Sequence, residues 1–243
     1  MEKVAVVIPL YKSQLSHWEE ISLRQGLTVL AKHPILFVAP RSLDLSFLQA
    51  YIDPIEVIRF DDSYFKSPKT YNKLLTNTSF YSAFSRFEYI LIYQLDAFVF
   101  EDQLLAWCDK GYDYIGAPKL RKHHVSNQYS CEPVVFNGGL SLRKIKPILR
   151  YLRIYHFFFK EWLANEDMMF SFAQRRVYPL RFLLKLPSWR EALAFSIEKN
   201  PQIAYRELKG LPFGCHAWER YDPHFWEQFI PVKIDKLNFA GLK

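Results

Sequence analysis

Glycine and cysteine are both scarce in this chain of 243 residues. The eight glycines exclude a collagen-like protein and a glycine-rich linker. The three cysteines, Cys108, Cys131 and Cys215, lie far apart and form no C-x-x-C pair. They support neither a disulfide framework nor a zinc ribbon. A reducing compartment is therefore the simplest environment for the chain.

Several common signatures are also missing. The sequence contains no G-x-G-x-x-G dinucleotide motif, no G-x-x-x-x-G-K-[ST] phosphate loop and no G-x-S-x-G nucleophile elbow. The first residues lack the charged segment, long apolar segment and cleavage site of a signal peptide. No run of about 18 uninterrupted apolar residues is present, so no transmembrane helix is expected. Together these absences predict a cytoplasmic protein.

The composition that is present is globular and rich in aromatic residues. Apolar residues make up 50% and charged residues 23% of the chain. Aromatic residues reach 17%, which indicates either a dense core or surfaces that stack on flat partners such as sugars or bases. The 32 Lys and Arg exceed the 25 Asp and Glu by seven. This excess favours anionic partners, although a basic soluble protein without such a partner would show it too.

The first half of the chain alternates apolar runs with segments of helical spacing. Strands are predicted for residues 4–11, 35–40, 55–60 and 89–96, and helices for 14–31, 46–51, 70–76 and 79–84. Continuous β-branched runs are typical of strands buried on both faces. This alternation predicts an α/β fold with a mostly parallel central sheet flanked by helices.

The second half is less regular. A strand is predicted for residues 113–118, a loop for 119–132, and a strand, glycine turn and strand for 134–144. Helices are predicted for 145–163 and 165–175, and residues 211–243 form a proline-punctuated, loop-rich tail. We find no repeat and no domain boundary, so a single domain over residues 1–243 is expected.

Ligands of open parallel sheets bind beyond the carboxyl ends of the strands, so the residues there are the candidates for chemistry. Gln94 and Asp96 follow the fourth and most apolar strand. Since they lie two residues apart, their side chains can point the same way. The carboxylate of Asp96 either caps the next turn or is compensated by a bound cation.

Three further clusters each have a structural and a functional interpretation. The N-G-G sequence at 137–139 is either a hairpin turn or backbone that lies close to a ligand. Glu166 and Asp167 are acids favoured in a first helical turn, and one of them could also serve as a general base. His216 is either a structural histidine or a ligand on a late loop that folds over a site.

The order of these clusters resembles that of GT-A glycosyltransferases: an apolar strand, Q-x-D, N-G-G, E-D at a helix start, and a late H-x-W. The segments WCDKGYDYIGAP, FNGGLSLR, NEDMMFS and PFGCHAW resemble a bacterial domain-of-unknown-function family regarded as GT-A-like. The resemblance extends from residue 4 to about residue 226 and is strongest over 89–167. It implies a GT-A-like, Rossmann-like fold whose tail, residues 211–243, closes the site.

The resemblance also implies roles for individual residues. Asp96 stands where GT-A enzymes carry the metal-binding second Asp of a D-x-D motif, and His216 stands where several families complete the metal shell. Gln94 replaces the first Asp, often a ribose contact, which leaves one carboxylate fewer for the metal. Asp167, beside Glu166, matches the catalytic base of inverting enzymes. The other nucleotide-sugar contacts implied are Pro9, Leu10, Tyr11, Lys73, Asn137, Gly138 and Gly139.

The implied activity is that of a metal-dependent hexosyltransferase. It would move a sugar from a nucleotide sugar, UDP-linked, to a hydroxyl of a bacterial surface glycan such as lipopolysaccharide, or of a lipid-linked acceptor. Inversion with Asp167 as base is expected, and Mn²⁺ or Mg²⁺ would stabilise the leaving diphosphate. The alternative is a non-catalytic nucleotide- or glycan-binding module of the same fold, which the replacement at Gln94 favours.

Two further partners follow from the charge. The basic stretch at residues 143–185 indicates either core helices with solvated Lys and Arg, or peripheral attachment to an anionic membrane. Attachment would place the protein on the inner face of the plasma membrane. The net charge also suits a nucleic acid, but no nucleic-acid-binding motif is present, so this partner is not expected.

Overall fold

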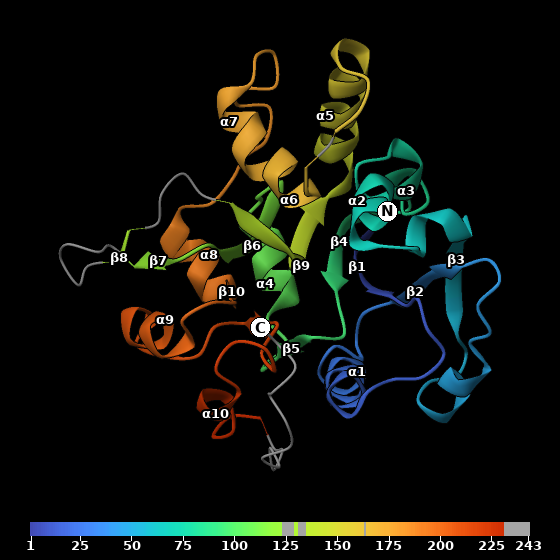
Figure 1. Cartoon of the computed structure of the whole chain (residues 1–243), viewed down its shortest axis with the longest axis vertical. Coiled ribbons are helices and arrows are strands. Elements are labelled where there is room, and N and C mark those ends of the chain that lie inside the picture. Colours follow the sequence, from blue (N-terminus) through green and yellow to red (C-terminus); the bar gives the residue numbers. More distant parts are fainter. Residues whose placement is uncertain (123–128, 131–134, 163, 231–243) are drawn as a thin grey trace.

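The computed structural model describes residues 1–122, 129–130, 135–162 and 164–230, which contain a central sheet of six strands. Its order is β3-β2-β1-β4-β9-β6 (Figure 1). The strands are β1 (Glu2–Pro9), β2 (Ile35–Pro40), β3 (Glu56–Phe60), β4 (Phe87–Tyr93), β6 (Tyr114–Pro118) and β9 (Phe136–Lys144). The first four in this order are parallel, and only β9 runs against its neighbours β4 and β6. The predicted mostly parallel sheet is thereby confirmed.

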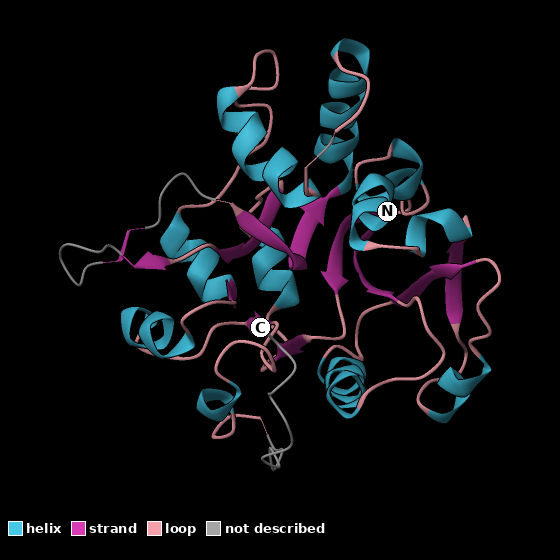
Figure 2. Cartoon of the chain, in the orientation of Figure 1, coloured by secondary structure: helices cyan, strands magenta, loops and turns pink. Residues whose placement is uncertain are grey.

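Helices flank this sheet (Figures 1 and 2). They are α1 (His17–Val29), α2 (Pro68–Leu75), α3 (Thr78–Ser82), α4 (Leu104–Asp109), α5 (Ile145–Phe158), α6 (Glu166–Met168), α7 (Gln174–Arg176), α8 (Trp189–Phe195), α9 (Pro201–Leu208) and α10 (Pro223–Trp226). A π-helical turn, Met169–Ala173, joins α6 to α7, and 3₁₀ turns cover Ser46–Ala50 and Asp62–Phe65. No helix in the described part of the chain is long and apolar enough to span a bilayer.

Local sequence explains where two of the site-bearing helices begin. The Ser16 side chain accepts a hydrogen bond from the Glu19 N–H, while the Glu19 carboxylate accepts one from the Ser16 N–H. Ser67 caps α2 in the same reciprocal way, and Pro68 occupies its first turn, where a missing N–H costs nothing. Both caps provide acceptors for N–H groups of the first helical turn, which have no partner within the helix.

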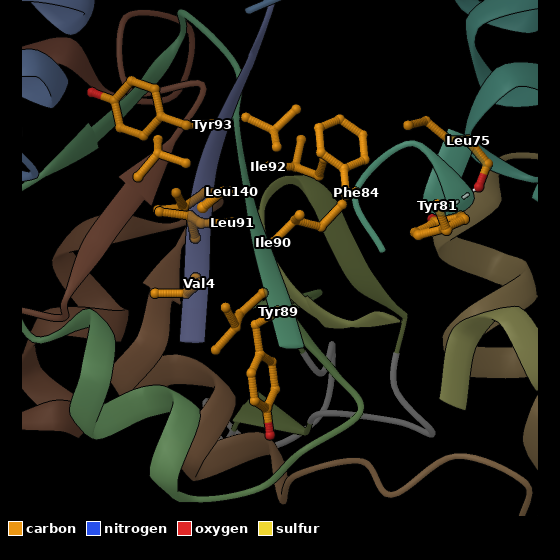
Figure 3. Packing of buried hydrophobic residues seen from close by; sticks show 14 of the residues in the cluster. Val4, Leu75, Tyr81, Phe84, Tyr89, Ile90, Leu91, Ile92, Tyr93 and Leu140 are labelled. Atoms are coloured by element: carbon orange, nitrogen blue, oxygen red, sulfur yellow. Dashed lines mark hydrogen bonds between the residues drawn. The ribbon is translucent and has the colours of Figure 1, made fainter. Parts of the chain in front are cut away.

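The strand β4 runs through the middle of the core. Figure 3 shows Ile90 and Ile92 on the side of Phe84, and Leu91 beside Leu140. The side chains of the three β4 residues and of Leu140 in β9 are fully buried. The continuous apolar run therefore fills both faces of the sheet, as the sequence predicts. This packing fixes the carboxyl end of β4, where Gln94 begins.

The strand–turn–strand predicted for residues 134–144 is wrong. Residues 136–144 form one continuous strand, β9, between β4 and β6. Neither Gly138 nor Gly139 has the positive φ that a tight hairpin turn requires; among the described glycines only Gly111 has it. Both glycines are required by packing instead, because a Cβ atom at either position would overlap a neighbouring side chain.

The late part of the chain has more regular structure than a loop. β11 (Gly214–His216) pairs antiparallel with β5 (Ala97–Val99) and parallel with β10 (Ser196–Ile197). Trp218 and Trp226 are fully buried in a second apolar cluster. A separate two-stranded ribbon joins β7 (Arg121–Lys122) to β8 (Tyr129–Ser130) within the predicted loop at 119–132. Residues 231–243 of the predicted tail, and Cys131, lie outside the described residues.

Ser22 links three of these elements, and its replacement tests the link. Its hydroxyl accepts a hydrogen bond from Trp218 Nε1 at 3.0 Å, and its carbonyl accepts one from the Tyr93 hydroxyl at 2.7 Å. In Ser22→Ala the buried indole N–H loses its acceptor, so we expect the free energy of unfolding in urea to fall by about 1–3 kcal/mol. The exposed Ser82→Ala at the end of α3 is the control, expected to change it by less than about 0.5 kcal/mol. Equal effects of the two substitutions would contradict the link.

Candidate functional site

The sheet register brings two of the predicted motifs together. Tyr93, the last residue of β4, pairs with Leu140 of β9. The next residue, Gln94, donates its backbone N–H to the Gly139 carbonyl at 2.9 Å. The Q-x-D and N-G-G sequences therefore lie side by side at one edge of the sheet.

The late histidine reaches the same place through β11. In the pairing of β11 with β5, His216 lies opposite Ala97, the residue after Asp96. Its Nε2 atom is 3.1 Å from Asp96 Oδ1 and 3.4 Å from Gln94 Oε1. The structure thus joins Gln94, Asp96 and His216, which the resemblance placed around one metal and nucleotide.

The two glycines of N-G-G leave room for functional side chains. A Cβ atom on Gly139 would overlap the imidazole of His216, and one on Gly138 would overlap the carboxylate of Glu166. Glycine is required because these side chains pack directly on the backbone of β9. Asn137 supports the arrangement, since its Oδ1 accepts a hydrogen bond from the Gly139 N–H at 2.7 Å.

A cavity of about 590 Å³ lies at the carboxyl ends of β1 and β4. Five of the predicted nucleotide-sugar contacts line it: Pro9, Leu10, Tyr11, Gln94 and Asp96. A cavity of this size suits a nucleotide-sized ligand. Asp96 therefore borders the cavity, whereas its partner His216 is not one of the lining residues.

Further cavity residues were not found by sequence reasoning. They are Lys12, Leu15, Ser16, Trp18, Glu19, Phe65, Lys66, Ser67, Pro68, Tyr71, Leu95 and Glu219. Lys12 directly follows the predicted strand-end contacts, and Glu219 lies three residues after His216, so both stood next to a recognised motif. Phe65 and Tyr71 belong to segments whose contact with the cavity depends on the fold of residues 61–71, which no motif indicates.

Lys73 is not brought to the cavity. It lies on α2 two residues after Tyr71, a rotation of roughly 200° around a helix, and so points away. Its Nζ atom is 2.5 Å from Glu161 Oε1, and both side chains are largely exposed. The position matched by the resemblance is therefore occupied here by a surface ion pair.

Asp96 and His216 have the chemistry and spacing of two metal ligands. Asp96 Oδ1 is buried and accepts no hydrogen bond, although it lies close to the imidazole. A separation of 3.1 Å is that of adjacent ligands around an octahedral ion with bonds of about 2.1 Å. No cluster of three His, Cys, Asp or Glu within the described ranges could hold an ion alone. The residues fit a hard divalent cation whose remaining ligands would be supplied by water or by a bound ligand.

The charges of Asp96 and His216 stabilise one another. Burial acts to raise the pKa of Asp96, but the positive charge of His216 outweighs it and holds the pKa below its usual value. Burial acts to lower the pKa of His216, and the Asp96 carboxylate outweighs that and raises it. The pair therefore favours a charged imidazolium, which a cation bound at the same atoms would replace.

Glu198 lies on the other side of the His216 ring, within ion-pair distance but without a hydrogen bond. The Glu198 Oε1 atom is 3.9 Å from His216 Nδ1 and accepts a hydrogen bond from Asn137 Nδ2 at 3.3 Å. A histidine that binds metal through one ring nitrogen commonly presents the other to a carboxylate, which fixes the ring. Sequence reasoning missed Glu198 because no motif marks it within the segment 181–200.

The predicted pair Glu166 and Asp167 divides into two different environments. Glu166 is buried and ion-paired with the fully buried Arg143 at 2.9 Å, so its carboxylate is already engaged. Asp167 has a buried Oδ1 without a hydrogen-bond partner. Burial, then the negative charges of Glu166 and Glu198, raise the pKa of Asp167 to about 7 against the opposing charge of Arg143.

Glu219 is a second carboxylate without a partner. It lines the cavity, and its Oε2 atom is buried and accepts no hydrogen bond. Burial and the nearby negative charge of Asp96 raise the pKa of Glu219 to about 7. Glu219 therefore adds a hydrogen-bond acceptor to the cavity, beside the groups of the Q-x-D motif.

Comparison with known proteins identifies a family and a shared fold. The family model described as "Protein of unknown function (DUF5672)" matches residues 54–216. A search of curated proteins found no match. The galactosyltransferase LgtC, solved with donor and acceptor sugar analogues, aligns with a TM-score of 0.55 and 12% identity over 96% of this chain and 98% of LgtC.

Two other glycosyltransferases show the same likeness. One acts in glycosylation of the major capsid of the virus PBCV-1, with a TM-score of 0.53 and 10% identity over 95% of this chain and 100% of that one. The bifunctional WbbM gives 0.52 and 12% over 95% of this chain and 49% of WbbM. At such identities the likeness shows the fold alone, and the expected GT-A-like fold is confirmed.

The raised pKa of Asp167 makes stability depend on pH in a defined direction. A carboxyl group that binds its proton more tightly in the folded chain stabilises the fold at low pH, and this contribution is lost as the pH rises from about 4 to about 7. Asp167→Asn removes the effect. We expect the unfolding free energy of Asp167→Asn relative to the wild type to increase over this range, by at most about 1.4 kcal/mol per pH unit.

Urea denaturation at a series of pH values measures this difference. Asp53→Asn, which alters an exposed carboxylate, is the control and should follow the wild-type pH profile. If the Asp167→Asn profile also ran parallel to the wild type, the buried, unpaired state of Asp167 would be disproved.

Proposed function

The chain belongs to the DUF5672 family, and we propose that it is a metal-dependent glycosyltransferase that moves a sugar from a nucleotide sugar to an acceptor hydroxyl. One observation carries the proposal. A nucleotide-sized cavity is lined by Asp96, which pairs with His216, and the unpartnered Asp167 follows Glu166, which packs on Gly138 of the N-G-G backbone. The fold shared with glycosyltransferases supports it.

The cavity supports binding of a nucleoside diphosphate. Trp18, Phe65 and Tyr71 offer aromatic surface for a base. Lys12 and Lys66 line the same cavity and favour an anionic ligand. We take the nucleotide to be uridine diphosphate and the sugar a hexose, as the sequence resemblance implies, and donor and acceptor sugar analogues in LgtC support a two-sugar site.

Asp96 and His216 would hold a Mn²⁺ or Mg²⁺ ion, which, when bound, stabilises the charge of the departing diphosphate. The chain's own residues prepare the site for it. Asn137 holds Glu198, Glu198 faces the distal nitrogen of His216, and Gly139 leaves room for the ring. The Gln94 amide oxygen lies beside His216 and adds a neutral polar contact.

Glu219 compensates for the carboxylate that the motif lacks. Where the resembled enzymes carry a ribose-binding Asp, this chain has Gln94, and Glu219 brings a carboxylate into the same cavity from the segment after β11. Its unpartnered oxygen can accept hydrogen bonds from the ribose hydroxyls. Its closeness to Asp96 supports a contact with the ribose rather than with the base.

Asp167 would take the proton from the acceptor hydroxyl. A base is most effective when its pKa lies near the working pH, and the pKa of Asp167 is raised to about 7. Glu166 cannot share this role while it neutralises Arg143, so we assign it to positioning. Direct attack on the donor carbon with Asp167 as base gives inversion. The acceptor is proposed to be a bacterial surface glycan or a lipid-linked sugar.

A second function is favoured by one specific feature. Gln94 in place of a carboxylate, with only two metal ligands supplied by the described residues, also suits a module that binds a nucleotide or glycan without turnover. The two functions share the cavity and differ at Asp167. The experiments below therefore test binding and turnover separately.

Metal-dependent nucleotide binding is the first expectation. UDP with Mn²⁺ should raise the melting temperature, by about 5–10 °C if ligand is present at 100 times its Kd. UDP without metal should raise it much less. Asp96→Asn and His216→Gln should remove the metal dependence because each loses a ligand.

The pair His33 and Asp102 offers a matched control. These side chains are 2.9 Å apart, like Asp96 and His216, but do not line the cavity. Asp102→Asn and His33→Gln should keep the metal-dependent shift. A shift that survives Asp96→Asn, or that the control substitutions abolish, would refute the assigned metal position.

Turnover should depend on Asp167. In Asp167→Asn, release of UDP from UDP-hexoses should fall by about 10²-fold or more, because the acceptor proton loses its base. The melting shift with UDP and Mn²⁺ should remain, since Asp167 does not line the nucleotide cavity. A wild-type protein that binds UDP-hexoses but neither transfers nor hydrolyses them with any acceptor would establish the binding module instead.

A further inference from the structure

The positive charge of the chain is concentrated in one segment. Residues 143–185 contain ten Lys and Arg and three Asp and Glu, a net charge of +7. The whole chain carries the same net charge of +7. The rest of the chain therefore has no net charge, so this segment accounts for the basic balance of the chain.

Most of these cations are available at the surface. The buried Arg143 is matched by Glu166, and Lys144 lies near Glu88, so these two are accounted for within the fold. Arg153, Arg176 and Arg181 are exposed, and none takes part in an ion pair between described residues. The segment's own acids do not neutralise them.

The same segment exposes four aromatic rings. The exposed fractions are 83% for Phe157, 58% for Phe158, 88% for Tyr178 and 72% for Phe182. Phe157 and Phe158 end α5, and the other two lie in the turn region after α7. Apolar groups of this size gathered at a protein surface are typical of an interaction site.

These rings and cations lie on one edge of the molecule. In Figure 1, α5 and α7 project from the sheet in the same direction. Arg150 of α5 donates a hydrogen bond to the Leu183 carbonyl at 3.2 Å, which ties α5 to the segment after α7. The Arg181 guanidinium lies 4.7 Å from the centre of the Phe182 ring. We call this surface the α5–α7 edge: Phe157, Phe158, Arg176, Tyr178, Arg181 and Phe182.

We propose that the α5–α7 edge docks on an anionic lipid membrane. Aromatic rings favour the headgroup level of a bilayer, where one side is apolar and the other wet. Arginines beside them would bind headgroup phosphates, and the net charge draws the edge to an anionic leaflet. Protruding rings separated by cations suit a deformable lipid surface, which accepts each ring independently and needs no complementary pocket.

Docking in this orientation also has a consequence for the site, which rests on the proposed function. The helix α6, which carries Asp167, lies between the bases of α5 and α7 (Figure 1). An acceptor hydroxyl held on a membrane lipid would then approach from the side of Asp167. The membrane contact itself requires neither nucleotide nor sugar transfer, so it can be tested without them.

Sedimentation of the full chain with lipid vesicles tests the proposal. We expect binding to vesicles in which phosphatidylglycerol replaces about a third of the phosphatidylcholine, and little binding to phosphatidylcholine alone. In about 1 M salt, where charges are screened within about 3 Å, binding should largely disappear. Equal binding to both kinds of vesicle, or none to either, would overturn the proposal.

Two pairs of substitutions separate charge from ring insertion. Arg176→Glu with Arg181→Glu should weaken binding to anionic vesicles by roughly 25-fold or more. Phe157→Ser with Phe182→Ser should weaken it by roughly 10-fold or more at unchanged net charge. The control, Lys32→Glu with Arg206→Glu, makes the same change in net charge at exposed positions of α9 and of the turn after α1, and should change binding less than about twofold.

The outcomes distinguish the membrane from other partners and from failure of the proposed function. Each variant should keep the wild-type melting temperature and its shift with UDP and Mn²⁺, which shows that fold and nucleotide site are intact. Equal loss in the control and the arginine variant would show diffuse charge attraction and overturn the assigned edge. Unchanged binding of the phenylalanine variant would overturn ring insertion. Vesicle binding without any nucleotide shift would refute the transferase and leave the membrane contact standing.

Discussion

The buried guanidinium of Arg143 is the constraint on which the rest of the site depends. A cation with no exposed surface must be paired and hydrogen-bonded, because an unpaired charge in the core costs several kcal/mol. Arg143 meets this need by binding Glu166 at 2.9 Å, the Tyr81 hydroxyl at 2.9 Å and the Gly138 carbonyl at 3.2 Å. These contacts join β9 to α3 and to the start of α6. The position of Asp167 follows, since it is the next residue after an acid that cannot move.

The backbone of β9 serves as the common support for both ends of the site. One side of the N-G-G sequence accommodates Glu166 and the other accommodates His216, and a Cβ at either glycine would collide with one of them. The metal candidates and the base candidate are therefore positioned by the same strand. Glu198 completes the connection, because it faces the His216 ring and its charge also contributes to the raised pKa of Asp167.

The sequence was most informative where chemistry follows a buried strand. The apolar runs predict β1, β2, β3 and β4 closely, and the rule that ligands meet strand ends selects Asp96, which lies beside His216 as expected. The prediction failed where tertiary packing determines the residue type. Adjacent glycines are typical of a turn, but in β9 they leave room for the His216 and Glu166 side chains, and the sequence does not distinguish the two cases. Arg143 gives no signal, since a charge at the end of an apolar strand is usually exposed. Lys73 of α2 does not line the cavity, whereas Tyr71, two residues earlier, does.

The charge distribution separates two functions in space. The site gathers the five carboxylates Asp96, Glu166, Asp167, Glu198 and Glu219. Arg143 pairs with Glu166, and His216 and Arg220 act on Asp96. This local excess of negative charge, together with burial, raises the pKa values of Asp167 and Glu219. Lys12 and Lys66 favour an anionic ligand in the same cavity, and the proposed divalent ion would offset the carboxylates that surround Asp96. The excess positive charge of the sequence falls within residues 143–185, whose exposed Arg176 and Arg181 lie on the α5–α7 edge. The arginines of the proposed membrane contact are thereby separate from the carboxylates of the candidate site.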